Sequence, residues 1–452
     1  MRIALINDGS YPYGSGAVGT WCHRLVRGLG EHAFWLVSLV DGAPAPRYRL
    51  LPNVAQASTV PLTGPPPVGP ARTAEIRQHG RLATHAAVLL CRGMLDDTEH
   101  SAAMFRSGLR RLTGLAADGT HPLGGVPLAA VLLDAWRATP DQHLPRPTLR
   151  DAESAAVALE SVVRALAAPV PEVDVAHCVH SGRSVLVAVA GKWRRGVPYL
   201  FTEHDGYLAD PLLDRFAAQP AARAVLVRFL SAVTRLGYAE AAAIAAPSER
   251  MCRWALHHGA DRARVTVIPP GVDPHDHPPL RDEPDQPVLA WLGQPAELPL
   301  ALATFGLVRR SVPAARLVVI GSAPDGAPRP EGVSFSGPVT GYRALFAMAT
   351  ALAISGTHAG MPYPLIEAML CGRATVCTDS SGLAAAVGIG ALVVPPGDPA
   401  RLAAACVALL TDPRLRRELG TAARTRARTR FRLGTMLDRH RELYEKALVS
   451  AA

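Results

Sequence analysis

The stretch SGTHAGMPYPLIEAMLCGRATVCTDSSG, which runs from Ser355 to Gly382, decides the fold. The apolar segment that leads into it predicts a buried strand, and a glycine turn follows. Pro362 stands near the start of a predicted helix, where a missing N–H is tolerated. That helix carries Glu367 and is expected to end before Gly372. The apolar segment 374–379 predicts the next strand. The stretch is therefore predicted to form a strand–helix–strand unit of a parallel sheet.

The same alternation of short apolar strands and helices extends on both sides of this stretch. It indicates a parallel sheet covered on both faces, and therefore a doubly wound α/β domain. A segment dense in Pro and Asp, 269–287, precedes this second half and is the expected hinge. The expected strands are 288–293, 315–321, 333–337, 351–356, 374–379 and 391–398, and the expected helices are 299–310, 341–349, 362–371 and 399–411.

The first half of the chain shows the same alternation, interrupted by helices. RIALIND predicts a first buried strand, GTWCHRLVRGL (19–29) a helix, and AFWLVSLVD (33–41) a second strand. After a Pro- and Gly-rich break, 60–72, apolar residues recur at helical spacing through 73–168, which predicts a helical insertion. The first half is thus predicted to be a Rossmann-like domain with an insertion. Its later strands are expected at 174–180, 197–205, 241–248 and 264–274.

Length and composition narrow the class of protein. The 452 residues suffice for two or three domains, and 49% hydrophobic against 19% charged residues argues against disorder. The net charge of +9 suits an anionic ligand or an acidic membrane surface, although a solvated basic surface is the simpler interpretation. Aromatic residues are only 5% and do not alternate with a basic run, so no nucleic acid partner is expected. Seven scattered cysteines without a C-x-x-C pair, and no signal-peptide layout, predict a cytoplasmic protein.

A glycine-rich loop follows the first strand and contains G-x-G-x-x-G at Gly14, Gly16 and Gly19. A dinucleotide fingerprint needs its first glycine at the strand-to-helix turn, where the helix N-terminus meets the pyrophosphate. Here DGSYPY separates the strand from Gly14, so the loop is too long for that turn, although Asp41 stands where a ribose-binding acid could lie. A nicotinamide-dependent oxidoreductase is therefore the more distant alternative. The glycines are interpreted as a loop whose backbone approaches a ligand, or as a turn that only caps the helix.

The segment GMPYPLIEAMLCGRATV resembles the signature of the retaining glycosyltransferases of family 4, E-G-x-P-x-x-x-x-E-A-M-x-x-G-x-P-V-V. Four further segments are similar to the Pel-exopolysaccharide branch of that family: SYPYGSGAVGTWCHRLVRGL, GVPYLFTEHDGYL, HHGADRARVTVIPPGVDP and FSGPVTGYRALFAMA. The resemblance covers most of the chain and is weakest in the helical insertion. It implies the GT-B fold: an α/β protein in which two Rossmann-like doubly wound domains face each other across a cleft, here with a helical insertion in the N-terminal domain.

The resemblance also implies a division into domains. Residues 1–270 would form the N-terminal, acceptor-side domain, with the insertion at about 73–168. Residues 271–430 would form the nucleotide-sugar domain. The last segment, 431–452, would form a helix that crosses back to pack on the first domain.

Residue roles follow from the positions that match the family's motifs. His204, which ends the strand FTEH, is implied to lie beside the reacting sugar as the catalytic residue. Glu367 is implied to hold the ribose of the donor, while backbone amides at the start of its helix bind the diphosphate. The alternatives are a buried, hydrogen-bonded histidine and a solvated helix carboxylate. The implied donor-binding residues are Gly360, Met361, Pro362 and Glu367, and the cleft glycine loop is Gly14, Ser15, Gly16 and Ala17.

Three positions that hold the donor in the family are degenerate in this chain. Ala359 replaces the first Glu of the E-x7-E motif, which holds the donor sugar. Gln294 and Leu298 replace the Arg and Lys that neutralise the leaving diphosphate. Loss of one preorganised electrostatic partner typically reduces the rate by about 10²–10³-fold, so the usual leaving-group mechanism is in question. The candidates to replace these cations from another direction are His358, Arg309, Arg310 and Arg343.

The sequence therefore indicates two alternative functions. The first is a retaining glycosyltransferase that transfers a hexose from a nucleotide sugar, a UDP-sugar, to a glycan, lipid or small-molecule acceptor. The alternative is a catalytically inactive GT-B paralogue, a pseudoenzyme that binds a nucleotide or serves as a partner subunit. No cofactor is expected, and no metal, because His177 and His180 lack a completing Cys or carboxylate. The expected partners are a nucleotide sugar and an acceptor, with a protein subunit or a peripheral membrane contact as further alternatives.

Overall fold

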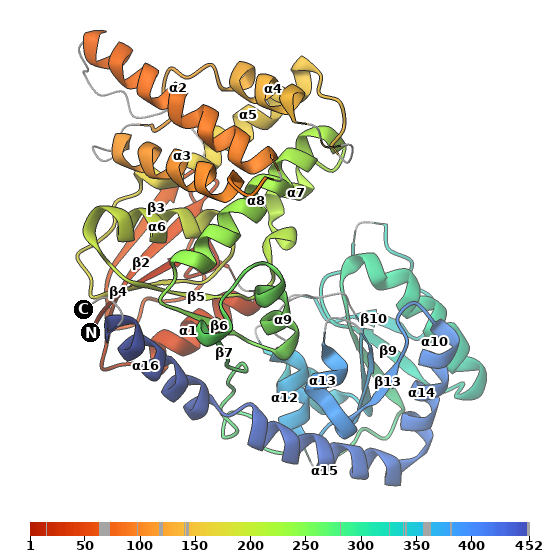
Figure 1. Cartoon of the computed structure of the whole chain (residues 1–452). Helices are drawn as coiled ribbons and strands as arrows, with labels where there is room; N and C mark the ends of the chain where they lie inside the picture. The colour runs from red at the N-terminus through yellow and green to blue at the C-terminus, as the bar shows by residue number, and fades with distance from the viewer. Residues whose placement is uncertain are drawn as a thin grey trace. The chain divides into compact units, whose positions relative to one another are not determined.

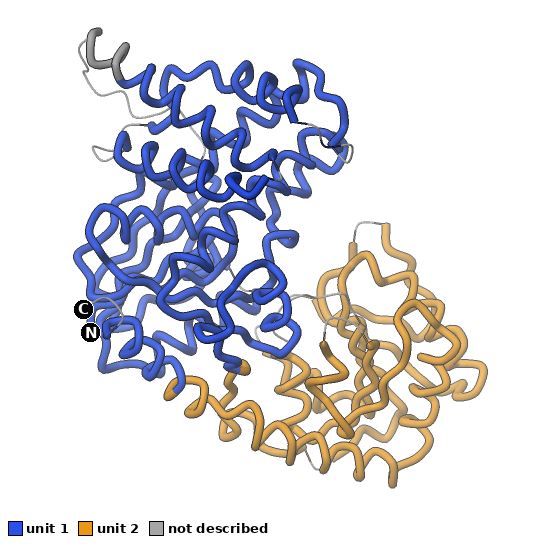
Figure 2. Tube along the Cα trace, in the orientation of Figure 1, with its two compact units in different colours: residues 1–268, 439–452 blue, residues 269–438 orange. Residues whose placement is uncertain are grey.

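The computed structural model consists of two compact units, which Figure 2 colours separately. Unit 1 comprises Met1–Ile268 and Arg439–Ala452, and unit 2 comprises Pro269–Asp438. For residues 73–78 the structure describes the backbone alone. The described residues are 1–14, 16–62, 73–96, 98–116, 121–139, 141, 144–280, 282–324, 326–337, 339, 341–355, 363–379 and 382–449.

Within the described residues, unit 1 contains a parallel sheet of seven strands in the order β3-β2-β1-β4-β5-β6-β7. The inner strands β4, β5 and β6 are buried along their whole length, as strands covered by helices on both faces are. The strands are β1 (Arg2–Asn7), β2 (Ala33–Val40), β3 (Val54–Pro61), β4 (Val175–Cys178), β5 (Tyr199–Thr202), β6 (Ala243–Ala246) and β7 (Val265–Val267).

The edge strand β3 is absent from the sequence-based prediction. It pairs only with β2, and Val60 is its single fully buried residue. The segment VAQASTVP therefore lacks the continuous apolar run that marks the inner strands. The break predicted at 60–72 begins inside this strand, and 63–72 lies outside the described residues.

The insertion predicted at 73–168 is mostly helical in the residues that the structure describes, with turns and loops between its helices. It packs on α6 (Arg183–Arg195) and α8 (Pro220–Glu240), as Figure 1 shows. Its Phe105 and Leu159 belong to the same hydrophobic core as Ile6 of the sheet, so the insertion completes the core of unit 1. The helices are α2 (Thr73–Leu95), α3 (Ser101–Leu115), α4 (Leu128–Ala138) and α5 (Leu149–Val163).

Unit 2 contains a second parallel sheet, of six strands among the described residues, in the order β10-β9-β8-β11-β12-β13. The two sheets with their helices confirm the predicted fold class. The strands are β8 (Val288–Leu292), β9 (Arg316–Val319), β10 (Val333–Phe335), β11 (Ala351–Ile354), β12 (Thr375–Thr378) and β13 (Leu392–Val394). The helices are α10 (Leu298–Ser311), α11 (Arg343–Met348), α12 (Tyr363–Cys371), α13 (Leu383–Val387), α14 (Pro399–Thr411) and α15 (Pro413–Arg430).

Two helices close the chain. The sequence pattern predicts no element at α15, because arginine dominates its composition. Only Arg416, Gly420, Ala423 and Ala427 are buried in it, while its leucines are partly buried against the core. Gly420 packs against Gly372, where a Cβ would stand 2.1 Å from the carbonyl oxygen. α16 (Leu433–Val449) follows, and its residues from Arg439 onward belong to unit 1. Throughout the described ranges, no helix has the length and apolar character needed to cross a bilayer.

Candidate functional site

The glycine loop of unit 1 is held at the carboxyl end of β1. Asn7 Oδ1 accepts a hydrogen bond from the Tyr11 amide at 3.1 Å, and Asn7 Nδ2 donates to Ser38 Oγ at 3.0 Å. Ser38 Oγ in turn donates to the Tyr11 carbonyl at 2.8 Å. The carboxyl edge of a parallel sheet is where ligands of doubly wound folds bind, so this loop is placed for a ligand.

The glycines of this loop have different physical roles. A Cβ at Gly19 would lie 2.3 Å from the Gly14 carbonyl oxygen, so Gly19 is required for the loop to close on α1 (Ala17–Gly28). A Cβ at Gly16 would meet nothing within 4 Å, and no side chain caps α1 at this residue. Among the residues that the structure describes, no side chain therefore caps the first amides of α1. Gly14, Gly16 and Ala17 are described, whereas Ser15 lies outside the described residues.

His204 lies just beyond β5 and is fully buried. Neither of its ring nitrogens has a hydrogen-bond partner among the described residues. Trp21 packs edge-on against the ring, with centroids 4.7 Å apart. Burial, followed by the charges of the neighbouring histidines, holds the pKa of His204 well below its usual range. The imidazole is therefore neutral at pH 7, with one donor and one acceptor unused by the protein.

Two further histidines lie near His204. His180 follows β4, its ring centroid is 6.2 Å from that of His204, and its Nε2 is 3.3 Å from Ser10 Oγ. His177 is bonded through Nδ1 to Tyr444 Oη at 2.7 Å and through Nε2 to Thr202 Oγ1 at 2.6 Å. His177 thus has neither nitrogen left for a metal. In the described part of the chain, no group of three His, Cys, Asp or Glu side chains is arranged to hold one.

A charged cluster lies beside the loop, and the sequence pointed only to Asp41 among its members. Arg183, at the start of α6, lies 3.4 Å from Asp41 and 3.9 Å from Asp210, measured between side-chain nitrogen and oxygen. Burial raises the pKa of Asp8 to about 6, against the opposing charge of Arg183. These residues are scattered in sequence, so no spacing could reveal them. The cluster places one cation and three carboxyl groups beside the carboxyl end of β1.

Glu203, which precedes His204, is buried as well. Its carboxyl group accepts hydrogen bonds from Tyr238 Oη and from the Gly206 amide. Burial raises the pKa of Glu203 to about 7. In the segment FTEHD, the sequence pointed to a role for His204 alone. Glu203 differs from an ordinary surface glutamate in that it is buried, which the segment does not reveal. Its bonds fix the turn that carries His204.

In unit 2, the carboxyl end of β8 carries the degenerate donor positions. Gln294 is exposed, and its backbone N–H donates a hydrogen bond to Glu297 Oε2 at 2.9 Å. The same carboxylate accepts from Ser355 Oγ at 3.2 Å. Leu298, the first residue of α10, is only 9% exposed. The turn thus presents a carboxylate where the family's motif supplies two cations.

Glu367 lies on α12 with its side chain largely buried. Its Oε1 is 4.0 Å from His277 Nε2, in the segment that precedes β8. The residues expected at the amino end of α12 lie outside the described residues; these are Ala359, Gly360, Met361 and Pro362, with His358 beside them.

Two of the proposed replacement cations are engaged elsewhere. Arg309 sits in the last turn of α10 and bonds to Glu331, so it lies at the opposite end of that helix from Leu298. Arg343 donates to the Pro278 carbonyl at 2.6 Å and contacts the Cys371 sulfur at the carboxyl end of α12. Neither guanidinium group is free to meet a diphosphate at the amino end of α10 or α12.

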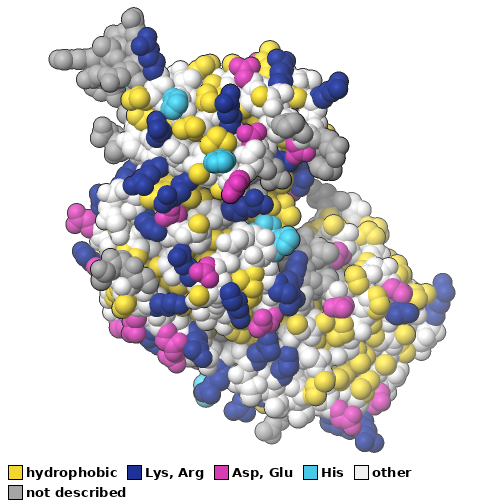
Figure 3. All heavy atoms as spheres, viewed as in Figure 1, with side chains coloured by type: hydrophobic (Ala, Val, Ile, Leu, Met, Phe, Trp, Pro, Cys, Tyr) yellow, Lys and Arg dark blue, Asp and Glu magenta, His cyan; other side chains and the backbone are white. Residues whose placement is uncertain are grey.

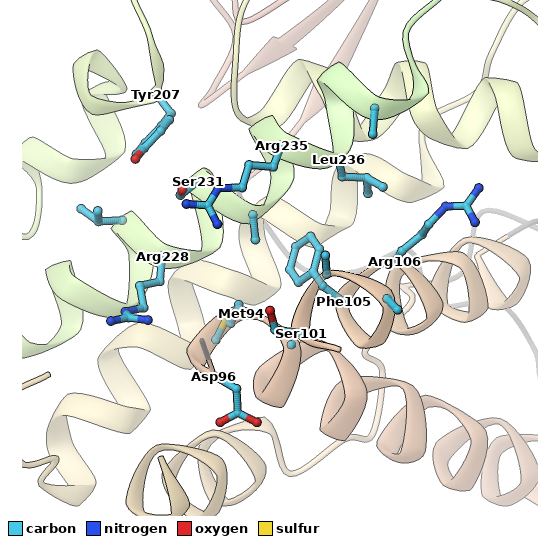
Figure 4. Close-up of a pocket in the computed structure, with 16 residues that line it drawn as sticks. Met94, Asp96, Ser101, Phe105, Arg106, Tyr207, Arg228, Ser231, Arg235 and Leu236 are labelled. Atoms are coloured by element: carbon cyan, nitrogen blue, oxygen red, sulfur yellow. The ribbon is translucent and has the colours of Figure 1, made fainter. Parts of the chain in front are cut away.

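A separate cavity of about 510 Å³ lies between α3 and α8, as Figure 4 shows. Phe105 and Met94 line it together with Arg106 and Arg228. Both guanidinium groups are already paired, Arg106 with Glu240 and Arg228 with Asp141. Arg235 also lines the cavity, which does not include the residues at the strand ends.

Comparisons with known proteins match the two parts of the chain to two different family models. The family model described as Domain of unknown function (DUF3492) matches residues 1–263, and that described as Glycosyl transferases group 1 matches residues 286–412. The D-inositol 3-phosphate glycosyltransferase of Segniliparus rotundus is 28% identical over 195 residues, or 37% of this chain and 43% of that protein. This chain thus matches less than half of the length of that relative.

Solved structures show the fold over almost the whole chain. Sucrose-phosphate synthase from Thermosynechococcus elongatus has a TM-score of 0.61 at 16% identity, covering 100% of both chains. HepE of Anabaena, solved in complex with UDP, has a TM-score of 0.59 at 14% identity, covering 98% of this chain and 99% of its own. The fold is therefore GT-B. The chain belongs to the family described as Domain of unknown function (DUF3492), and it is a glycosyltransferase-like protein whose second unit carries a Glycosyl transferases group 1 domain.

Proposed function

We propose that this protein is a retaining glycosyltransferase of family 4, of the exopolysaccharide branch, that transfers a hexose from a UDP-sugar to a glycan, lipid or small-molecule acceptor. The observation that carries the proposal is His204: a buried, neutral imidazole at a strand end, whose two ring nitrogens bond to none of the described residues. Leaving buried donors and acceptors unpaired costs free energy, which a polyhydroxylated ligand would relieve. The match of residues 286–412 to the group 1 glycosyl transferases supports it.

In this proposal each unit has its own task. Glu367 accepts hydrogen bonds from the ribose of the donor, and the amides of Gly360 and Met361 bind its phosphates. His204 donates a hydrogen bond to the hexose as its glycosidic bond to the phosphate breaks. Glu203 fixes the turn that carries His204. The residues supply hydrogen bonds and electrostatic stabilisation, and the proposal needs no metal or other cofactor.

The donor site itself favours the second candidate function, a catalytically inactive paralogue that binds a nucleotide or a partner subunit. Leu298 is buried and Gln294 is uncharged, and Glu297 adds a negative charge at the same turn. A diphosphate leaving group would meet repulsion there in place of two cations. The two functions differ in how strongly the β-phosphate contributes to binding.

Calorimetric titration of the full-length protein with UMP, UDP and UDP-glucose separates the two functions. An active transferase is expected to prefer UDP to UMP and, with water as the acceptor of the glucosyl group, to hydrolyse UDP-glucose slowly to glucose and UDP; His204→Ala should abolish that release of UDP. Near-equal weak affinities, or none, together with no release of UDP, would contradict the transferase and support the inactive paralogue.

Substitution of Glu367 tests the nucleotide site directly. Each hydrogen bond to a charged group contributes about 1.5–3 kcal/mol, so Glu367→Ala should weaken UDP binding by roughly 10-fold or more. UDP-glucose should bind little better than UDP, because Ala359 cannot hold the sugar. Glu331→Ala is the matched control, since its side chain is 88% exposed in the same unit. If the Glu367→Ala variant and the wild type bind UDP with equal affinity, Glu367 does not belong to the nucleotide site.

A further inference from the structure

The segment around α15 concentrates the positive charge of the protein. Residues 412–432 hold eight arginines against Asp412 and Glu418, a net +6 of the chain's +9. α15 lies at the lower margin of unit 2 in Figure 1. Over much of the face shown in Figure 3, Lys and Arg are interspersed with Asp and Glu. The charge of this segment is thus a local feature.

Most of these arginines have no carboxylate partner in the described structure. Arg424 donates to the carbonyls of His277 and Leu370, and Arg426 to those of Ala385 and Ala386. Hydrogen bonds to carbonyl groups fix a guanidinium group without cancelling its charge. Carboxylates neutralise two members of the segment: Arg416 pairs with Glu283, and Arg414 pairs with Glu418.

Four exposed arginines make no side-chain hydrogen bond or ion pair with the described residues: Arg417, Arg428, Arg430 and Arg432. At about 100° per residue, Arg417 and Arg428 lie on one flank of the helix. Arg430 lies about 200° from Arg428, on the opposite flank. The outer edge of α15 is therefore bordered by free positive charges on both flanks.

An exposed aliphatic side chain accompanies this basic edge. Ile389, in the 3-10 turn Gly388–Gly390, is 84% exposed. The turn packs directly on α15, where a Cβ at Gly388 would meet Arg426 at 2.8 Å and one at Gly390 would meet Ala423 at 2.6 Å. Ile389 thus projects into solvent on the flank of the helix that carries Arg430.

We propose that the outer edge of α15, with Ile389, is a docking surface for an anionic lipid bilayer. The free arginines would meet the lipid headgroups, with their aliphatic stems lying along the interface, while Ile389 enters the boundary between headgroups and acyl chains. Basic side chains near an anionic leaflet each contribute favourably, and several are needed for stable attachment. The surface belongs to unit 2 alone and is independent of the proposed transfer reaction.

The side chains favour lipid over nucleic acid as the partner. Nucleic acid surfaces interleave basic residues with aromatic platforms, and α15 contains no aromatic residue. The residues between the arginines on its exposed crest include Thr421, Thr425 and Thr429. An isolated, exposed isoleucine beside guanidinium groups adds affinity at a bilayer interface and none at a phosphodiester backbone.

Flotation of the full-length protein with vesicles tests the surface. Vesicles of phosphatidylglycerol and phosphatidylcholine in equal parts should bind the protein, vesicles of phosphatidylcholine alone should not, and added salt should weaken the binding. The combined variant Arg417→Gln, Arg428→Gln, Arg430→Gln and Arg432→Gln should lose at least about 100-fold in partitioning. Ile389→Ser should lose roughly 10-fold while the charge stays unchanged.

A matched control lowers the net charge equally at exposed arginines of unit 1: Arg110→Gln, Arg111→Gln, Arg195→Gln and Arg250→Gln. It should retain the binding. Equal binding to neutral and anionic vesicles, or equal losses in the two fourfold variants, would overturn the proposal. Tighter binding to single-stranded nucleic acid, unaffected by Ile389→Ser, would overturn it in favour of the other class of partner. The single Ile389→Ser variant remains a test if the fourfold variant does not fold.

Discussion

At the scale of single residues, the donor site of unit 2 is defined by charge. Gln294 follows β8 and is exposed, so it tolerates a longer side chain. Gln294→Arg should restore a cation and raise the affinity for UDP relative to UMP by about 10-fold, which the titration above measures. Gln286→Arg is the matched control, because Gln286 is also exposed but precedes the same strand, at the opposite edge of the sheet. A similar gain in both variants would mean that net charge alone is responsible.

Glu203 provides a second prediction at this scale, through pH. Its pKa is raised to about 7 by burial, while an unfolded glutamate titrates near 4.5. The folded state therefore binds the proton more tightly, and stability falls as pH rises through this window. Urea unfolding should show wild type losing about 3 kcal/mol relative to Glu203→Gln between pH 4 and pH 8, at about 1.36 kcal/mol per pKa unit. A constant difference across this range would mean that folding does not shift the pKa of Glu203.

At the scale of elements, the contacts of α16 within unit 1 include a buried hydrogen bond and an exposed ion pair, whose contributions to stability differ. Tyr444 is fully buried and bonded to His177, while Arg441 pairs with Glu31 at the surface. Tyr444→Phe should cost about 1–3 kcal/mol of unfolding free energy, because it leaves a buried nitrogen of His177 unpaired. Arg441→Gln should cost less than about 1 kcal/mol, as exposed ion pairs do. Urea unfolding compares the two, and equal costs would contradict this account.

At the scale of the whole molecule, the insertion is part of the core of unit 1. Phe105 of α3 is 2% exposed, whereas Leu82 of α2 is 51% exposed. Phe105→Ala should therefore destabilise unit 1 by about 3–5 kcal/mol, and Leu82→Ala should cost far less. We also expect UDP binding by folded Phe105→Ala to equal that of wild type, since the nucleotide site is assigned to unit 2. Removal of 73–168 would expose the core, so this single substitution is the better test of that independence.

The sequence by itself determined the architecture where the apolar pattern is strong. Alternating apolar strands and helices predicted two parallel sheets, and the strand–helix–strand unit of 355–382 identified the class of fold. Elements without that pattern were missed: β3, because Val60 is its one buried residue, and α15, because arginine dominates its composition.

Only the tertiary structure decided the chemical state of the site. It joins His177 to Tyr444 across 267 positions, gathers Asp8, Arg183 and Asp210, and leaves the nitrogens of His204 unpaired. It also separates the arginines of α15 that carbonyls hold from those that stay free. Hydrogen bonding, burial and pKa depend on which groups meet in space. Sequence spacing fixes such meetings within one helix or strand, but not between segments that only the folded core brings together.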